Sequence, residues 1–268
     1  MIFAQSFFEH VLDTRHWEIF DSINLSFNLP AGLSKFIVLQ MIVAVVLCAI
    51  FIPLARRVRG GEPPKGWFWN LSESLLTFVR DEVAVPCIGE HDANRFLPFL
   101  WTVFLYIAFN NLFGLIPFMG SATSSLWVTG ALALCAAAVI HGTPIIKYGP
   151  WHYLKSYYPH IEAPMGLGVV IGLFIAVMEI VGHGIKTFVL MVRLYANIFA
   201  GHTVLAVILS FIVMAKDAPK YLFWPISFGS VLFIVALSLL ELFVGLLQAY
   251  VFTFLSALFL GMTLHPEH

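Results

Sequence analysis

Five predominantly apolar segments, each long enough to cross a lipid bilayer, limit what this chain can fold into. An α-helix rises about 1.5 Å per residue, so about 20 residues cross the ~30 Å hydrocarbon core. We place these segments at residues 33–55, 96–118, 125–146, 165–215 and 221–264. The last two are about twice the usual length of a membrane span. They therefore predict strongly tilted helices that form a long hairpin.

The composition agrees with a chain that lies in lipid. Hydrophobic residues make up 60% of the sequence and charged residues 11%, whereas soluble domains carry about 25% charged residues. We therefore predict an all-α membrane protein in which residues 1–268 form a single integral membrane domain, with about five membrane-embedded helices and one interfacial amphipathic helix. The net charge of -1 provides no basic field for nucleic acid.

Two segments are expected to lie outside the bilayer core. Residues 1–32 are rich in acidic side chains and are predicted to form an N-terminal extramembrane segment. Residues 67–85 carry apolar side chains at helical spacing, with Glu73, Arg80, Asp81 and Glu82 on the polar side. This pattern predicts an amphipathic helix at the membrane interface. A loop helix packed on the protein's own surface is an equally good interpretation.

Basic residues predict the orientation, because cytoplasmic loops are enriched in Lys and Arg. The cations that gather on one side of the predicted helices are Arg56, Arg57, Arg59, Lys65, Arg80, Arg95, Lys147 and Lys155. We expect a multi-pass protein of the cell inner (plasma) membrane, with its N-terminus outside and its C-terminus in the cytoplasm. An organellar inner membrane is the alternative location.

Polar side chains interrupt the two longest apolar segments. A charged group at mid-membrane depth costs roughly 2.5–3.5 kcal/mol or more and usually has a function. At 100° per residue, one narrow stripe of the fourth segment contains Glu179, His183, Lys186, Arg193 and Asn197. His202 points to a different side of that helix. On the last segment, Ser238, Glu241 and Gln248 share one face.

The predicted hairpin brings some of these side chains to matching depths. If the turn lies near Pro219 and Lys220, His202 matches Glu241, and Arg193 matches Gln248. Arg193 keeps its charge at any physiological pH, and no acid lies three or four positions away on its own helix. We therefore expect its partner in another chain.

Less specific roles remain open for two residues of the stripe. Lys186 could extend its ammonium to the membrane interface. His183 could serve as a hydrogen-bonded packing residue. They and Ser238 are secondary candidates.

Two motifs resemble subunit a of the F-type ATP synthase. The run from Met191 to His202, MVRLYANIFAGH, resembles the family's Arg-Leu-x-x-Asn-x-x-Ala-Gly-(Glu/His) signature on its fifth helix. The run from Leu247 to Phe252, LQAYVF, is similar to the motif on its last helix. A weaker match extends from Phe99 to Pro117. Tyr195-Ala196 replaces the more common Phe-Gly, and the segment around Lys186 departs further from the pattern.

The resemblance implies a stationary subunit beside a rotating ring of c subunits. Arg193 would face a carboxylate of the ring, with Gln248 beside it and Asn197 in the same motif. His202 and Glu241 would line the outer proton path, and Glu179 would lie on the cytoplasmic path. The implied partners are the c-ring, the peripheral-stalk subunit b, the F1 sector and the lipid bilayer. The resemblance implies no catalytic residue, cofactor or metal of the chain's own.

A proton-coupled secondary transporter is the alternative function. Such transporters usually contain inverted repeats and helices that are broken at mid-membrane. Neither feature is visible in this sequence.

Overall fold

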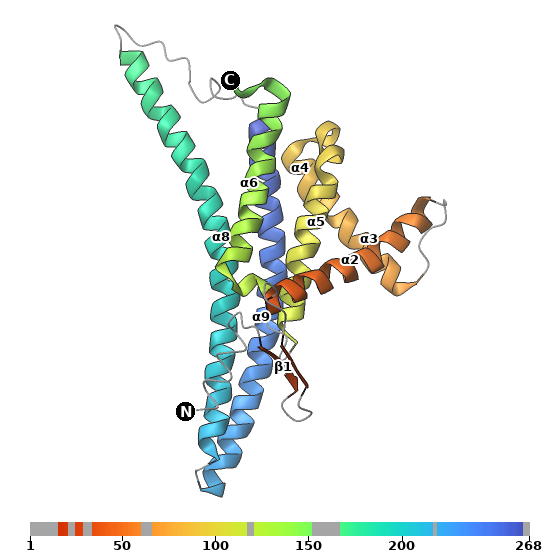
Figure 1. Ribbon diagram of the computed structural model, residues 1–268, viewed down its shortest axis with the longest axis vertical. Helices are drawn as coiled ribbons and strands as arrows, with labels where there is room; N and C mark the ends of the chain where they lie inside the picture. Colours follow the sequence, from red (N-terminus) through yellow and green to blue (C-terminus); the bar gives the residue numbers. More distant parts are fainter. Residues whose placement is uncertain are drawn as a thin grey trace.

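A computed structural model describes residues 16–20, 25–28, 34–59, 66–116, 121–151, 167–216 and 219–264 of the chain. Within these ranges five helices are long and apolar enough to span a membrane: Lys35–Val58, Glu90–Gly114, Leu126–Tyr148, Val181–Ala215 and Tyr221–Leu264. The all-α membrane fold predicted from the sequence is confirmed (Figure 1).

Helices α8 (Leu167–Ala215) and α9 (Lys220–Leu264) form a long hairpin that runs along the molecule (Figure 1). Their 49 and 45 residues correspond to lengths of about 74 and 68 Å. Both lengths are about twice the thickness of the hydrocarbon core, so the helices must tilt strongly or extend beyond it. Each helix of the hairpin is therefore long enough to cross the whole hydrocarbon core.

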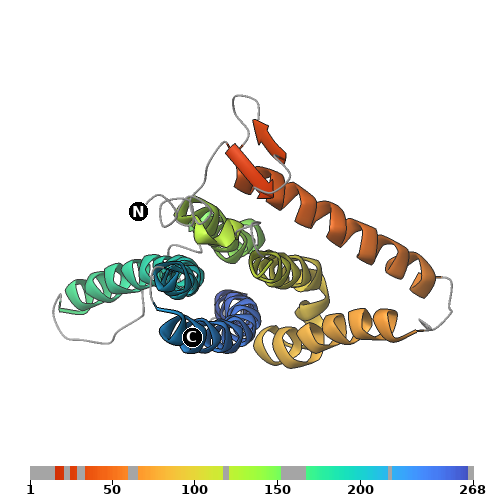
Figure 2. The same ribbon diagram turned by 90° about the horizontal axis from the view of Figure 1, so that it is seen from below.

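Helices α5 (Glu90–Gly114) and α6 (Leu126–Tyr148) pack beside this hairpin (Figure 2). The short 3-10 helix η3 (Ala122–Ser124) lies between them in the sequence. The shared core contains Leu100 and Ile107 of α5 together with Phe252 and Leu260 of α9, all fully buried. These large side chains hold α5 against the second half of α9.

Helix α2 (Lys35–Arg59) and helix α3 (Trp67–Phe78) lie to one side of the bundle (Figure 2). Together with α5 they line an open cavity of about 1160 Å³. The α3 side chains Phe68 and Leu71 are exposed, as expected for an apolar helix face at a membrane interface. The first half of α3 therefore does not use its apolar face to pack on the protein.

The chain then continues through a π-helix, η2 (Val79–Ala84), into the short helix α4 (Val85–Ile88). Val79 and Val83 are fully buried in the core, and the indole Nε1 of Trp101 donates a hydrogen bond to the carbonyl of Leu76 at 2.9 Å. The second half of the amphipathic segment thus packs on the protein. The second half of residues 67–85 therefore fits a helix packed on the protein's own surface, whereas the exposed apolar side chains of the first half fit an interfacial helix.

One end of the bundle is closed by contacts to the end of α9. The Tyr148 hydroxyl donates to the carbonyl of Leu264 at 3.2 Å. Gly261 lies so close to the carbonyl of Cys87 that a Cβ at this position would overlap the oxygen. Glycine is therefore required where α4 crosses α9.

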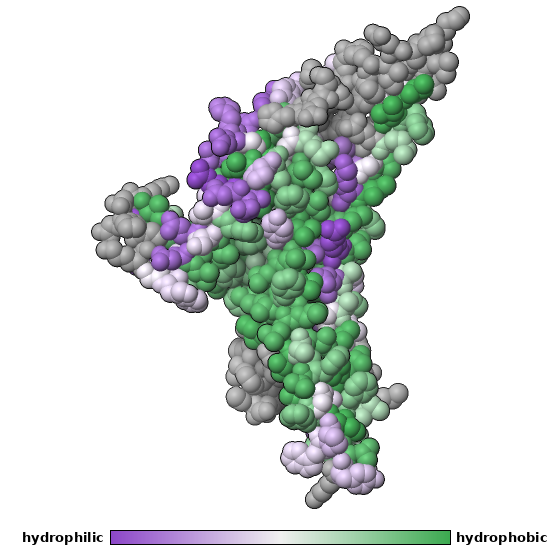
Figure 3. All heavy atoms as spheres, turned by 180° about the vertical axis from the view of Figure 1, so that it is seen from behind, coloured by the Kyte–Doolittle hydropathy of each residue, from purple (hydrophilic) through white to green (hydrophobic). Residues whose placement is uncertain are grey.

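Hydrophilic and apolar surface are separated along the length of the molecule (Figure 3). Figure 3 shows an apolar surface over the lower part of the molecule and hydrophilic residues gathered at the upper end of the bundle. A second, narrow line of hydrophilic surface follows α8 through the apolar region (Figure 3).

Two features differ from the sequence-based expectation. Strands β1 (His16–Phe20) and β2 (Leu25–Asn28) form an antiparallel pair in the N-terminal segment, for which no structure was predicted. Helix α5 begins at Glu90 instead of residue 96. Gly89, with φ 93°, separates it from α4, and Glu90 and Asp92 occupy its first turn, where the helix dipole stabilises carboxylates.

Candidate functional site

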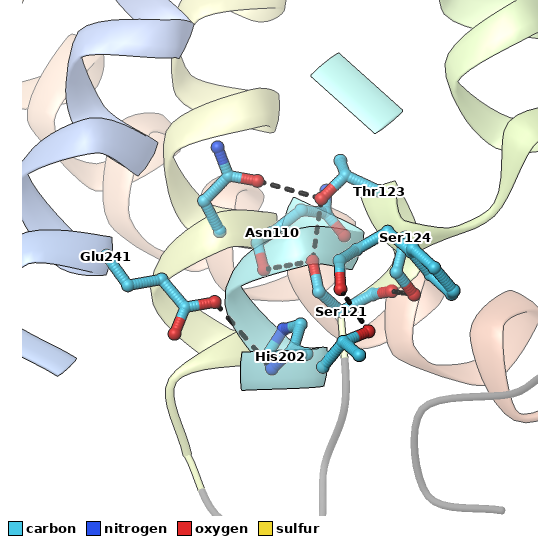
Figure 4. Close-up of polar contacts among 9 residues, drawn as sticks. Asn110, Ser121, Thr123, Ser124, His202 and Glu241 are labelled. Carbon is cyan, nitrogen blue, oxygen red and sulfur yellow. Dashed lines mark hydrogen bonds and ion pairs between the residues drawn. The ribbon is translucent and has the colours of Figure 1, made fainter. Parts of the chain in front are cut away.

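The two longest helices place His202 and Glu241 against each other. Nδ1 of His202 on α8 lies 3.7 Å from Oε1 of Glu241 on α9, and the two side chains are 14% and 8% exposed (Figure 4). The distance fits an ion pair when the imidazole is protonated, although it exceeds the usual length of a hydrogen bond. This contact confirms the register predicted for the pair from the position of the turn.

Glycines give these side chains the space that they occupy. A Cβ at Gly201 would lie 2.7 Å from Oε1 of Glu241, so the carboxylate would have to move aside. A Cβ at Gly114 would meet Ser121 at 2.6 Å and Nε2 of His202 at 3.3 Å. The glycine in the Ala-Gly-His part of the motif therefore allows the Glu241 carboxylate to approach α8 closely.

A chain of buried polar side chains lies beside this pair. The Thr123 hydroxyl donates to Oδ1 of Asn111 at 2.8 Å and lies 2.6 Å from the Ser121 hydroxyl (Figure 4). Nδ2 of Asn111 donates to the carbonyl of Gly245 on α9 at 2.9 Å. These bonds connect α5 and the η3 turn to α9. These residues were not predicted as site residues, although Asn111 belongs to the weaker motif.

Several buried polar atoms here have no hydrogen-bond partner within the described part of the chain. They are both carboxylate oxygens of Glu241, Nε2 of Gln248 and Oδ1 of Asn110. Buried polar groups are nearly always satisfied, and an exception in a native protein often marks a functional group. The crevice between α5 and α9 beside Glu241 has no room for a water molecule. Glu241 is therefore closed off on its α5 side.

Lys35 is a further charged residue at this site that sequence reasoning missed. It begins α2 and is only 1% exposed, and its ammonium acts electrostatically on His202. A lysine at the start of an apolar helix usually extends its charge to the membrane interface. The sequence therefore gave no signal that this one is buried.

Arg193 is exposed on α8, whereas the next residue, Leu194, is fully buried. Within the described ranges Arg193 forms no ion pair or hydrogen bond. Asn197, one turn further, is half-buried, and Gln248 on α9 is 4% exposed. The guanidinium thus points away from its own subunit, as a cation with a partner in another chain would.

A second set of polar contacts lies on the other side of Arg193 along α8. The ammonium of Lys186 lies 5.0 Å from the ring centroid of Phe259 on α9. The rings of His183 and His141 are 5.1 Å apart. Arg193 therefore lies between two polar regions, one at Lys186 and one at His202.

The remaining predicted residues contribute less to this geometry. Ser238 is half-buried on α9 and forms no hydrogen bond within the described part of the chain. Glu179 belongs to α8, but its side chain lies outside the described residues. No group of three metal-ligating His, Cys, Asp or Glu side chains occurs among the described residues.

Comparison with known proteins gives a consistent result. Residues 37–261 match the family model described as ATP synthase A chain. The chain is 37% identical over 240 residues to "ATP synthase subunit a" of Myxococcus xanthus (strain DK1622), which covers 90% of this chain and 75% of that protein. It is 35% identical over 268 residues to "ATP synthase subunit a 2" of Chlorobaculum tepidum (strain ATCC 49652 / DSM 12025 / NBRC 103806 / TLS), covering 96% and 72%.

The length of the relatives varies. The chain is 43% identical over 201 residues to "ATP synthase subunit a" of Anaeromyxobacter dehalogenans (strain 2CP-1 / ATCC BAA-258), which covers 74% of this chain and 49% of that protein. The chain thus spans from about half to about three quarters of the length of these relatives.

Proposed function

The chain belongs to the ATP synthase A chain family, and we propose that it is the stationary subunit that conducts protons to and from a rotating ring of c subunits. In this function two offset half-channels reach the ring from opposite sides of the membrane. The flow of protons is thereby coupled to ATP synthesis. The observation that carries the proposal is the position of Arg193, an exposed cation on a membrane helix between two polar regions of the subunit.

Arg193 gives the ring a place where a carboxylate can ionise. A ring carboxyl group that faces lipid is stable in its protonated form, because a bare charge there is costly. Opposite the guanidinium the ionised form gains a cation partner. The ring carboxyl group therefore releases its proton when it approaches Arg193 and takes up another after it has passed. Gln248 on α9 is buried, so we assign its amide to the inner, polar side of this region and not to direct contact with the ring carboxylate.

The outer path runs through the His202–Glu241 pair. A proton that arrives at the imidazole can pass to the Glu241 carboxylate, and from there to the ring carboxyl group that has left Arg193. The hydroxyl and amide groups of Ser121, Thr123 and Asn111 keep this region polar on its inner side. The opposite path begins near Lys186, with Glu179 as its acidic residue. Arg193 separates the two paths and repels a proton that would pass directly between them.

The arrangement of cations supports the proposed orientation. Lys147, in the last turn of α6, lies at the same end of the bundle as the C-terminal end of α9, since Tyr148 bonds to Leu264. Positively charged loops favour the cytoplasm. We therefore place this end in the cytoplasm of a bacterial cell, with the protein in the plasma membrane. Subunit b and the F1 sector are the further partners that this function requires.

The alternative of a proton-coupled secondary transporter has no support in these comparisons. Such a protein would work alone, whereas an exposed Arg193 that has no ion pair or hydrogen bond among the described residues favours a partner in a second protein. Co-purification with a small ring protein that carries a mid-membrane carboxylate would separate the two functions. A chain that transports protons alone in liposomes would contradict the proposal.

The central test is the substitution Arg193→Ala in the assembled complex. We expect loss of ATP-driven acidification of inverted membrane vesicles and loss of ATP synthesis, while the complex still assembles. Arg95→Ala is the matched control, because Arg95 is also exposed but lies in the first turns of α5. Coupled pumping by the Arg193→Ala complex at the unsubstituted rate would refute the proposed role.

A further inference from the structure

Two histidines from different helices meet within the membrane bundle. The ring centroids of His141 on α6 and His183 on α8 are 5.1 Å apart, with an angle of 74° between the ring planes. Both residues are half-buried, so each ring keeps an accessible side. The contact is separate from the His202–Glu241 pair, because His202 lies on the other side of Arg193 along α8.

Two contacts place this pair near the end of the bundle that contains the C-terminal end of α9. The hydroxyl of Thr263 donates to the carbonyl of Ile140, the residue before His141, at 3.3 Å. Lys186, about 4.5 Å further along α8 than His183, lies over Phe259. The pair is therefore at the side that the proposed orientation assigns to the cytoplasm, about 15 Å along α8 from Arg193.

The surroundings show where the pair can meet water or the ring. In the turns of α8 that precede His183, the side chains of Leu173, Phe174, Val177 and Met178 are exposed. α8 and α6 also diverge toward this end in both ribbon views (Figures 1 and 2). His183 thus lies where α8 comes into contact with the bundle, between an open helix face and the stripe that leads to Arg193.

We propose that the His141–His183 pair is a proton-transfer site on the cytoplasmic path, which rests on the proposed function of the chain. A neutral imidazole accepts a proton at one ring nitrogen and releases another proton from the second nitrogen. The proton that a ring carboxyl group loses near Arg193 passes through water along the polar stripe of α8 and is then taken up by one imidazole. It leaves from the pair to cytoplasmic water, and both rings return to the neutral form. Proton uptake for ATP-driven pumping follows the reverse order.

The free-energy cost of polar side chains in a membrane segment, and the nearby positive charge of Lys186, distinguish this role from simple packing. An aliphatic side chain would fill the same space between α6 and α8 without placing polar groups in a membrane segment. Among the groups that the structure describes, His183 and the Lys186 ammonium act electrostatically on His141. Because the Lys186 ammonium lies over the ring of Phe259, its position is set by α9. It therefore adds a fixed positive charge beside the pair.

The test uses the complete complex in inverted vesicles, with His141→Gln and His183→Gln compared with His91→Gln. His91 is an exposed histidine at the start of α5 and serves as the control. Either substitution in the pair should lower the ratio of protons pumped to ATP hydrolysed, or the pumping rate, by at least about threefold. The double variant should lose no more than the worse single variant, because both rings serve one path. Normal pumping by both single variants overturns the proposal.

Zn²⁺ added to the cytoplasmic face gives a readout that a packing role would not produce. Two imidazoles bound to one tetrahedral Zn²⁺ have ring centroids about 5 Å apart, which matches the observed pair. Zn²⁺ should therefore inhibit pumping by the unsubstituted and His91→Gln complexes, and either substitution in the pair should raise the inhibitory concentration about tenfold. Equal sensitivity of all four complexes would contradict a shared, accessible site.

Chemical rescue covers the case in which a variant assembles poorly. Imidazole in the buffer should restore pumping to assembled His141→Ala complexes, normalised to their ATP hydrolysis, but not to Arg193→Ala complexes. Slow pumping without rescue assigns the pair to packing. Failure of the proposed function would appear differently, as coupled pumping that survives Arg193→Ala whatever the histidine variants do.

Discussion

His202 and Glu241 meet across the two longest helices of the chain, with 3.7 Å between Nδ1 and Oε1. Neither carboxylate oxygen of Glu241 has a hydrogen-bond partner within the described part of the chain. The His202 imidazole is thus the polar group that contacts this buried acid, and the two groups act as one unit. The following predictions depend on this unit and on the contacts that hold it in place.

Removing the acid should slow transport without preventing assembly. Glu241→Gln keeps the shape of the side chain but cannot carry a proton between His202 and the ring. We expect a reduction of about 10- to 100-fold in ATP-driven proton pumping, typical of a lost proton-transfer group. The exchanged double variant, His202→Glu with Glu241→His, should pump faster than either single variant, because it restores one acid and one imidazole. A normal rate for Glu241→Gln would remove Glu241 from the proton path.

Gly201→Ala should displace the Glu241 carboxylate, because the added methyl group would lie 2.7 Å from Oε1. We expect slower pumping and a loss of stability of about 1–3 kcal/mol, as found for overpacked sites. Gly229→Ala on α9 is the matched control, since nothing lies within 4 Å of a Cβ there. The control should be neutral or slightly stabilising, because alanine favours the helix. Thermal unfolding and pumping rates of the two complexes provide the comparison.

Thr123→Val should weaken the contact between the η3 turn and α5. The substitution keeps the shape but removes the donor to Oδ1 of Asn111, which leaves a buried acceptor unsatisfied at a cost of about 1–3 kcal/mol. Thr143→Val is the control, because that hydroxyl bonds to the carbonyl of Val139 within its own helix. We expect a lower unfolding temperature for Thr123→Val than for Thr143→Val. If the two variants unfold together, the Thr123–Asn111 bond contributes nothing to stability.

Gly261→Ala should disrupt the crossing of α4 and α9, because the methyl group would overlap the carbonyl of Cys87. A backbone oxygen cannot rotate away as a side chain can, so the helices must separate. We expect reduced amounts of assembled subunit in the membrane. Gly142→Ala, which places a methyl group in open space on α6, should assemble normally. The two variants can be compared by their yield in the purified complex.

Much of the site could be predicted from the sequence, because the spacing of residues along a helix determines which side chains share a face. The stripe on α8 and the depth match of His202 with Glu241 needed only the helical repeat and the position of the turn. The motif around Arg193 identified the family. The buried chain of Ser121, Thr123 and Asn111 could not be predicted in this way, because its members come from separate segments whose approach depends on packing. The same holds for His141, which lies on α6 and meets α8 only in the folded chain.

The sequence by itself determined that this chain is a membrane protein with about five spanning helices. It also determined that a permanent cation lies in one of these helices. The length of an apolar helix that spans a bilayer is set by the thickness of the hydrocarbon core. A charge inside that core carries a large free-energy cost wherever it lies, so neither conclusion needs knowledge of packing. Tertiary structure alone decided which faces meet: that Lys35 is buried and that Glu241 rests against Gly201. Those contacts depend on the shapes of neighbouring helices at close range, where one added methyl group is enough to displace a neighbouring side chain.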